Sequence, residues 1–203
     1  MRMKPDEMRE KLICGTARVI ATEGLDKATT KQIGLTTSIN EAYIYRLFKD
    51  KEDLFAKTFA YLDDELVSLC MAYLPIMRRE DLAFRECGRL YFAEVWRFLL
   101  GNSEKCRAFI RYYYSPYFAK YSATEHRERY VDFLERFKVC FKEEANVWMI
   151  LNHILDTMLS FAVKVFDGAL PDNPDTEEHV FRLVYASSQQ YFKDENAQDT
   201  IKE

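Results

Sequence analysis

Apolar residues recur at helical spacing along almost the whole chain. Residues 6–23 place Met8, Leu12, Val19 and Ile20 on one face, and Gly24 follows as a stop signal. From residue 51, apolar side chains recur at spacings of four, three, four, three and four until Pro75 ends the pattern. No stretch shows the sustained alternation of a half-buried strand, so the sequence predicts an all-α fold.

About nine helices are expected, separated by turn-forming residues such as Gly101-Asn102 and Ser115-Pro116. Their expected ranges are 6–23, 29–36, 41–48, 51–74, 80–100, 103–114, 124–143, 146–167 and 176–193. No internal repeat or low-complexity tract interrupts them. The first three helices are short and close together, whereas the remaining ones are long enough to build a larger helical domain.

The second and third helices form a compact pair joined by a tight turn. Thr29 and Asn40 are suitable N-caps, and the turn between the two helices is Thr37-Ser38-Ile39. Two apolar-faced helices joined in this way form a helix-turn-helix, whose second helix fits the major groove of DNA, roughly 12 Å wide. The pattern therefore predicts a DNA-binding regulator.

Side chains near the start of the third helix are the candidates for base contact. Tyr43 offers a ring for thymine methyl groups and a hydroxyl for an acceptor, while Arg46 can bind guanine or simply neutralise a phosphate. Lys51 begins the fourth helix, where the helix dipole favours an anion. The alternative is a solvated helix start, but the lysine follows the third helix by only a few residues, which favours a phosphate contact. The full set of expected DNA contacts is Thr29, Lys31, Glu41, Ala42, Tyr43, Tyr45, Arg46 and Lys51.

The apolar residues of the helix-turn-helix are better explained as its own small core. This cluster should fix the angle between the helices. Its members are Ile33, Ile39, Ile44, Leu47 and Phe48.

Net charge gives DNA binding only slight support. The whole chain carries −4 at neutral pH, but residues 1–55 hold 10 Lys/Arg against 9 Asp/Glu, and the rest of the chain is acidic. Attraction to DNA must therefore come from a few positively charged side chains at specific positions and not from a broad basic surface.

Composition points to a soluble protein of the cytoplasm. Five widely spaced cysteines include no C-x-x-C pair, which argues against a zinc site or a disulfide framework. Charged residues interrupt every apolar run before eighteen residues, and no basic segment followed by an apolar stretch lies near the start. We therefore expect neither a membrane span nor export.

No enzyme signature emerges from the sequence. His153 and Asp156 are one helical turn apart, but no serine, cysteine or second carboxylate lies at a telling spacing beside them. His126 and His179 lie among charged residues and are expected at the surface, and three scattered histidines make no metal cluster. We expect no catalytic residue, no metal and no cofactor.

The stretch from Arg9 to Phe59 resembles the DNA-binding domain of the TetR family of bacterial transcriptional regulators. The resemblance rests on Thr29, Ile33-Gly34, Thr37-Ser38-Ile39-Asn40, Ile44-Tyr45-Arg46-Leu47-Phe48 and Lys51-Glu52-Asp53-Leu54. The chain departs from the family pattern where Gly34 replaces Ala, Ser38 replaces the turn Gly and Ala42 replaces a frequent Gly. Beyond about residue 60 it matches the family only in length and helix count.

This resemblance implies roles for several residues. Tyr45 and Lys51 take the family's phosphate contacts, and Tyr43 takes its base-contacting position. It also implies a helix-turn-helix domain at residues 1–50, followed at residues 51–203 by a helical domain for effector binding and dimerisation. A serine at position 38 would carry some backbone strain if its φ is positive.

The resemblance further implies a homodimer in which the last two long helices of each subunit form a four-helix bundle. Apolar stripes on both helices suit such pairing, with a repeat near 3.5 residues on the first. The alternative is that both stripes are core within one chain. The expected interface residues are Leu151, Leu155, Met158, Ala162, Val165, Val180, Val184, Ser187 and Tyr191.

Aromatic residues are dense between Phe84 and Trp148, where they either fill a core or line an apolar pocket. In the family the corresponding helices enclose an effector site. Expected pocket residues are Tyr91, Trp96, Tyr113, Phe137 and Trp148, with Arg97, Arg111 and His153 as polar orienting groups.

The function expected from the resemblance is that of a regulator, usually a repressor, which binds a palindromic double-stranded DNA operator as a homodimer. A small apolar or aromatic effector would release it. Two rivals stay open. One is a regulator that has no effector and is controlled by a protein partner. The other is a helical small-molecule carrier or enzyme in which the helix-turn-helix has only a structural role.

Overall fold

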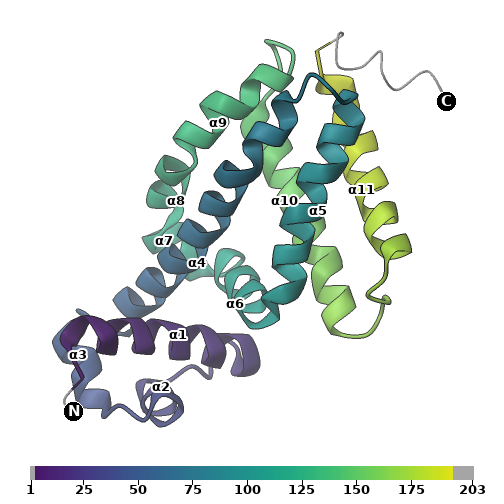
Figure 1. The fold of residues 1–203 in the computed structure, drawn as a ribbon. Helices are drawn as coiled ribbons and strands as arrows, with labels where there is room; N and C mark the ends of the chain where they lie inside the picture. Colours follow the sequence, from purple (N-terminus) through teal and green to yellow (C-terminus); the bar gives the residue numbers. More distant parts are fainter. Residues whose placement is uncertain (1–2, 194–203) are drawn as a thin grey trace. The chain divides into compact units, whose positions relative to one another are not determined.

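The computed structural model describes residues 3–193, and within them the fold is built from helices (Figure 1). There are eleven α-helices rather than about nine, together with four short 3-10 helices. The only pairing of strand type in this part of the chain is an isolated antiparallel bridge between Phe141 and Phe192. The expected all-α class is confirmed, and the helix count is corrected.

The helices follow one another with short connections. Their bounds are α1 Pro5–Glu23, α2 Thr30–Thr37, α3 Ile44–Leu47, α4 Lys51–Tyr73, α5 Phe84–Gly101, α6 Ser103–Tyr113, α7 Pro116–Tyr121, α8 Ala123–Arg129, α9 Val131–Phe137, α10 Val147–Phe166 and α11 Pro174–Ser188. The 3-10 helices are Glu41–Tyr43, Leu74–Arg78, Lys138–Cys140 and Gln189–Tyr191.

Two differences account for the higher count. Pro116 starts α7 because proline suits the first position of a helix, so the expected break at Ser115-Pro116 is also a helix start. The single helix expected over residues 124–143 is divided into α8, α9 and a 3-10 turn. At the division, Arg129 is held by carboxylates of α4, and the next residue, Tyr130, is fully buried among the rings of Phe133 and Trp148.

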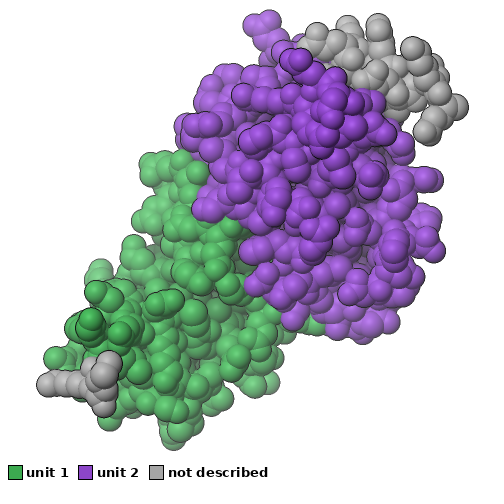
Figure 2. Space-filling view, viewed as in Figure 1, with its two compact units in different colours: residues 1–66, 104–129 green, residues 67–103, 130–203 purple. Residues whose placement is uncertain are grey.

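The chain forms two compact units (Figure 2). Unit 1 consists of residues 1–66 and 104–129, and unit 2 consists of residues 67–103 and 130–203. The helix α4 contributes residues to both. The domains expected at residues 1–50 and 51–203 were defined by function, whereas the two units are defined by packing. That division by function stays a prediction.

Unit 1 contains the helix-turn-helix and an aromatic core. Leu12, Ile33 and Ile44 are fully buried where α1, α2 and α3 meet. Farther along α4, the ring of Phe59 stacks on Tyr112 of α6, with ring centres 4.9 Å apart. Arg111 donates from Nη1 to the backbone oxygen of Ile20 at 2.8 Å, which ties α6 to the C-terminal end of α1. Arg111 is therefore engaged within unit 1.

In unit 2 the helices α5, α10 and α11 run side by side and contact one another (Figure 1). Their shared core includes Phe92, Met158 and Phe181. By length and composition α10 is apolar enough to cross a membrane, which for a single helix is weak evidence, and here it packs against α5 and α11.

The apolar stripes expected to form a dimer seam face this core. Five of their nine members are at most 6% exposed within the unit and are therefore core residues, namely Leu151, Met158, Ala162, Val180 and Val184. A side chain already buried in its own chain has no area left to bury against a partner. Leu155, Val165, Ser187 and Tyr191 stay partly exposed.

Candidate nucleic-acid interface

The turn of the helix-turn-helix is built by α2 and the residues that follow it. Thr29 caps α2 by accepting a hydrogen bond from the backbone N–H of Gln32 at 3.1 Å, as expected for an N-cap. Ser38 follows α2 with φ 55° and ψ 33°, in the left-handed region that usually selects glycine. The N–H of Ile39 then bonds to the oxygen of Gly34 at 3.1 Å, so the chain folds back tightly over the end of α2.

This tight turn explains why Gly34 stands where the TetR-like pattern has alanine. A Cβ atom at Gly34 would lie 2.8 Å from the backbone oxygen of Ile39, which is closer than real Cβ atoms approach. A similar close approach joins α1 to α2, because a Cβ at Gly15 would lie 2.1 Å from Cγ2 of Thr37. Both glycines let backbone segments pack without an intervening side chain.

The helix expected over residues 41–48 is not uniformly α-helical. Asn40 caps it through Oδ1, which accepts from the N–H of Ala42 at 2.9 Å, but residues Glu41–Tyr43 form a 3-10 turn and only Ile44–Leu47 are α-helical. We call residues 40–47 the recognition segment. Ile44, with Ile39 and Phe48 at its two ends, is buried and anchors the segment to the rest of unit 1.

The outward face of the recognition segment carries the expected contact residues. Glu41, Ala42, Tyr45 and Arg46 are exposed, with Tyr45 at 59%, and Tyr43 is half-buried. The guanidinium of Arg46 lies 5.1 Å from the ring centre of Tyr43, a cation–π arrangement that positions the two side chains together. Thr30 of α2 donates a long hydrogen bond of 3.4 Å to Oε2 of Glu41.

A reciprocal cap fixes the start of α4 immediately after the recognition segment. Oδ1 of Asp50 accepts from the N–H of Asp53 at 2.7 Å, and Oδ2 of Asp53 accepts from the N–H of Lys49 at 3.0 Å. This cap resembles a capping box and sets Lys51 at the first position of α4. Nζ of Lys51 lies 5.3 Å from the ring centre of Phe55, one turn further along α4.

The remaining expected contacts lie on α2 or just before it. Thr29 and Lys31 are exposed, although the hydroxyl of Thr29 is already used as a cap. Sequence reasoning missed Leu35, a large apolar side chain of α2 that is 68% exposed. An apolar residue at an outward helical position beside the turn was the available signal.

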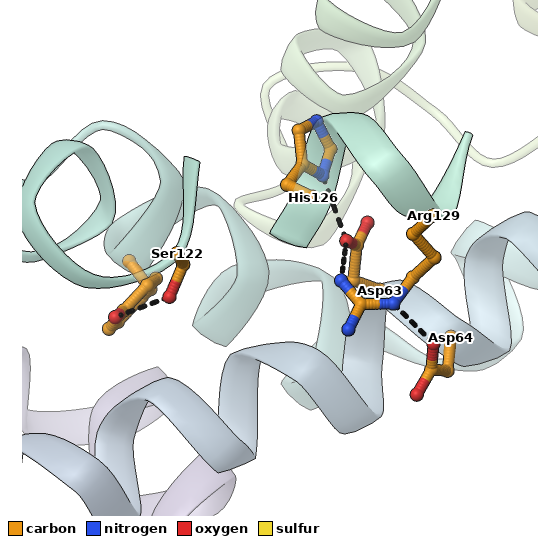
Figure 3. A network of polar contacts seen from close by, with 6 residues as sticks. Asp63, Asp64, Ser122, His126 and Arg129 are labelled. Atoms are coloured by element: carbon orange, nitrogen blue, oxygen red, sulfur yellow. Dashed lines mark hydrogen bonds and ion pairs between the residues drawn. The ribbon is translucent and has the colours of Figure 1, made fainter. Parts of the chain in front are cut away.

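A second feature missed from the sequence is a buried ionic network in unit 1 (Figure 3). Asp63 of α4 is fully buried, and its Oδ2 accepts from Nη1 of Arg129 and from Nδ1 of His126, each at 2.8 Å. Nε of Arg129 also donates to the exposed Asp64. The expectation that His126 lies at the surface is wrong, because it is 5% exposed and surrounded by aromatic rings.

The network keeps its arginine charged. Burial lowers the pKa of Arg129, but Asp63 and Asp64 raise it by more, so the pKa lies above its ordinary value. Nearby, the hydroxyls of Tyr112 and Ser122 are hydrogen-bonded at 2.9 Å (Figure 3). These contacts hold α8 and the segment before it against α4 and α6.

Unit 2 contains a small apolar cavity of about 70 Å³. Tyr91 and Phe137 are the two expected pocket residues that line it, and Leu155 lines it as well. Sequence reasoning missed Cys70, Gly88 and Ser188, which also line the cavity. Their small or sulfur-containing side chains gave no pattern that separates a cavity wall from ordinary core.

The other expected pocket residues of unit 2 lie away from the cavity wall. Trp96 is buried against Phe92, and Trp148 contacts Tyr130. Arg97 is exposed and donates to Glu94 at 2.7 Å. His153 is exposed on α10, where Nε2 lies 2.8 Å from Oγ of Ser187.

Tyr113, like Arg111, belongs to unit 1. Its ring packs against Phe118, with ring centres 4.5 Å apart. Five of the eight expected DNA contacts therefore lie on the recognition segment, whereas Thr29 and Lys31 belong to the start of α2 and Lys51 to the start of α4. The expected pocket residues are not brought together.

A helix-turn-helix with an exposed second segment is the geometry found in DNA-binding proteins, and comparison with known proteins shows the same likeness. Residues 12–58 match the bacterial regulatory proteins of the tetR family. A 102-residue stretch, 50% of this chain, is 28% identical to an HTH-type transcriptional regulator of Haemophilus influenzae. That stretch spans about half, 52%, of the relative's length.

Solved structures extend the likeness to the whole fold. A TetR family transcription regulator from Marinobacter aquaeolei VT8 superposes with a TM-score of 0.75 at 18% identity, covering 92% of this chain and 98% of that one. A TetR-family transcriptional regulator from Haemophilus influenzae superposes with a TM-score of 0.61 at 19% identity, covering 91% and 98%. The resemblance to TetR-family transcriptional regulators is confirmed.

Proposed function

We propose that this protein binds a palindromic DNA operator as a homodimer, represses transcription there, and is released by a small apolar effector. The observation that carries the proposal is the recognition segment, whose polar and aromatic side chains are exposed while Ile39, Ile44 and Phe48 anchor it. A rigid helix start that presents side chains to solvent is the geometry needed to contact base edges. We place the protein in the cytoplasm, where it meets DNA.

Individual residues divide between specificity and affinity. Glu41, Ala42, Tyr43 and Arg46 are assigned to base edges, because they occupy the first turns of the recognition segment. Four further residues are assigned to phosphates, which set position and affinity but carry no sequence information, namely Thr29, Lys31, Tyr45 and Lys51.

DNA binding is tested by fluorescence anisotropy with a labelled duplex taken from upstream of the protein's own gene. Lys51→Ala should weaken binding to all duplexes about equally and flatten the salt dependence by about one unit of slope. Lys138→Ala, an exposed lysine of unit 2 that lies outside α10 and α11, is the matched control. A loss confined to one duplex sequence would contradict the phosphate role of Lys51.

Base contact is tested separately. Tyr43→Ala should relax the preference for particular base pairs in a selection from random duplexes, by a cost of about 1–3 kcal/mol per lost contact. An unchanged preference profile would remove Tyr43 from the specificity residues. No binding of the wild-type protein to any duplex, at any salt concentration, would instead favour a carrier or an enzyme.

The homodimer is assigned to the outer face of α10 and α11. Only 28% of the apolar stretch of α10 is fully buried within one chain. Met149 of α10, Leu183 of α11 and the nearby Tyr191 are 66%, 54% and 41% exposed. Between the two helices lies a groove of about 320 Å³ lined by Met149, His153 and Tyr191. A second copy would cover this face and supply a second recognition segment for the other half-site of a palindromic operator.

Sedimentation velocity tests the dimer. Leu183→Asp should convert the dimer to monomer, because it puts a charge into the paired face. Val139→Asp changes another exposed apolar residue of unit 2 and should leave the dimer intact. A Leu183→Asp protein that is still dimeric would place the pairing surface elsewhere.

Effector control is assigned to the cavity of unit 2. A ligand can shift DNA affinity only through different affinities for two conformations of the protein. The rival regulator without an effector predicts that no small molecule changes operator binding, so a screen of apolar compounds in the anisotropy assay separates the two.

A further inference from the structure

The cavity of unit 2 has a composition that restricts what it can bind. Its walls are apolar, and the described residues that line it include no charged side chain. Moving an isolated ionic group into such surroundings costs far more free energy than moving a neutral one. A charged ligand would therefore have no compensating partner there.

One residue of the cavity wall carries a buried hydroxyl that has no hydrogen-bond partner. The surface that the cavity exposes is entirely apolar, so this hydroxyl reaches a ligand only after the wall rearranges. Ser188, at the end of α11, is 2% exposed, and its Oγ makes no hydrogen bond within the described part of the chain. The hydroxyl of Tyr91, by contrast, is already used, since it donates to the backbone oxygen of Cys70 at 3.2 Å. An unpaired buried hydroxyl is costly, and a ligand with a matching group would remove that cost.

The size of the cavity indicates that it must expand when it is filled. A volume of about 70 Å³ is roughly half of the 150 Å³ that accommodates benzene in an engineered protein cavity. Met77 and Met158 form part of the wall, and methionine side chains repack more readily than branched ones. Binding would thus select a conformation of unit 2 with a larger cavity.

We propose that the ligand of this cavity is an uncharged, largely apolar molecule of about one aromatic ring or more that carries a single hydrogen-bonding group, held by the hydroxyl of Ser188. This inference rests on the proposed function, because it names the chemical class of the effector. Ser188 is the specificity residue for the polar group, and the aromatic and methionine side chains accommodate the body.

The experiment uses four probes that share a methylphenyl body: toluene, p-cresol, p-toluate and 4-methylbenzylammonium. Binding to the full-length protein is measured directly by isothermal titration calorimetry. We expect toluene and p-cresol to bind, with both charged probes at least about 100-fold weaker than p-cresol because no partner compensates their charge. Equal or tighter binding of a charged probe, or no binding by any of the four, would overturn the proposed class.

Two variants locate the bound probe. Ser188→Ala should weaken p-cresol roughly 5- to 10-fold, the effect of one net hydrogen bond, and change toluene less than about twofold. Gly88→Ala should weaken both probes, because its new methyl group lies an ordinary 3.8 Å from Tyr185 and reduces the cavity without displacing a neighbour. Gly101→Ala adds the same methyl group in open space and should change neither.

The outcomes separate this inference from the proposed function. Unchanged p-cresol affinity in Ser188→Ala would remove the hydroxyl contact, and unchanged affinity in Gly88→Ala would place the probe outside the cavity. The same p-cresol is then added to the operator-binding assay. If it binds as expected but leaves DNA affinity unaltered, the effector role fails while the ligand class of the cavity stands.

Discussion

The buried network of unit 1 offers a sharp test, because one arginine pairs with two adjacent carboxylates in opposite environments. Arg129 binds Asp63, whose side chain is fully buried, and Asp64, whose side chain is 62% exposed. Replacing Arg129 by Met keeps most of the side-chain volume and removes the positive charge. Asp63 is then left as a buried carboxylate, with His126 as its remaining donor.

The expected loss follows from this burial. Removing one partner of a buried ion pair typically costs about 3–5 kcal/mol. Because His126 still donates to Asp63, we expect the lower end, about 3 kcal/mol. With a urea m-value of about 2 kcal/mol/M, the unfolding midpoint should fall by about 1.5 M.

The control is Asp64→Asn, which removes the ion pair between Arg129 and the exposed Asp64. Exposed pairs contribute about 0–1 kcal/mol, so its midpoint should fall by less than about 0.5 M. Both midpoints are read from circular dichroism in urea. A shift for Arg129→Met no larger than that for Asp64→Asn would refute the claim that burial makes this pair important.

A double variant tests the physical reason. Asp63→Leu combined with Arg129→Met replaces the buried pair by apolar side chains, which is often neutral or stabilising. It should be more stable than Arg129→Met alone, because no uncompensated carboxylate is left. If it is less stable, the loss in the single variant comes from packing and not from charge.

Three further predictions follow from single residues. Ser38→Gly should raise stability by about 1 kcal/mol and the melting temperature by about 2–4 °C, because glycine adopts a positive φ without strain, and a lower melting temperature would contradict this. Gly34→Ala should weaken operator binding by about tenfold, since its Cβ would push on Ile39 and displace the recognition segment, whereas Gly101→Ala should bind normally. At pH 8 a disulfide reagent should label one thiol rapidly, the exposed Cys14, because burial raises the pKa of Cys106 to about 12 and of Cys140 to about 11. Rapid labelling of two or more thiols in the folded protein would show that a buried cysteine is accessible.

The sequence by itself determined the elements whose signals are local. The caps at Thr29 and Asn40, the amphipathic repeat of α4 and the proline after it could all be recognised from side-chain types at fixed spacings, because helix starts and buried faces depend on neighbours a few residues away. For the same reason the exposed positions of the recognition segment could be predicted before any coordinates.

Only the tertiary structure decided features that join distant parts of the chain. Periodicity indicated that α10 and α11 have apolar faces, but not whether those faces meet each other or a second subunit. Five of the nine predicted seam residues are buried within their own chain. His126 looked like a surface residue because its sequence neighbours are charged. It is buried because it contacts Asp63, 63 residues earlier, and the aromatic rings around it. The cavity likewise arises from imperfect packing among α4, α5, α9, α10 and α11, and no local pattern encodes a space between helices.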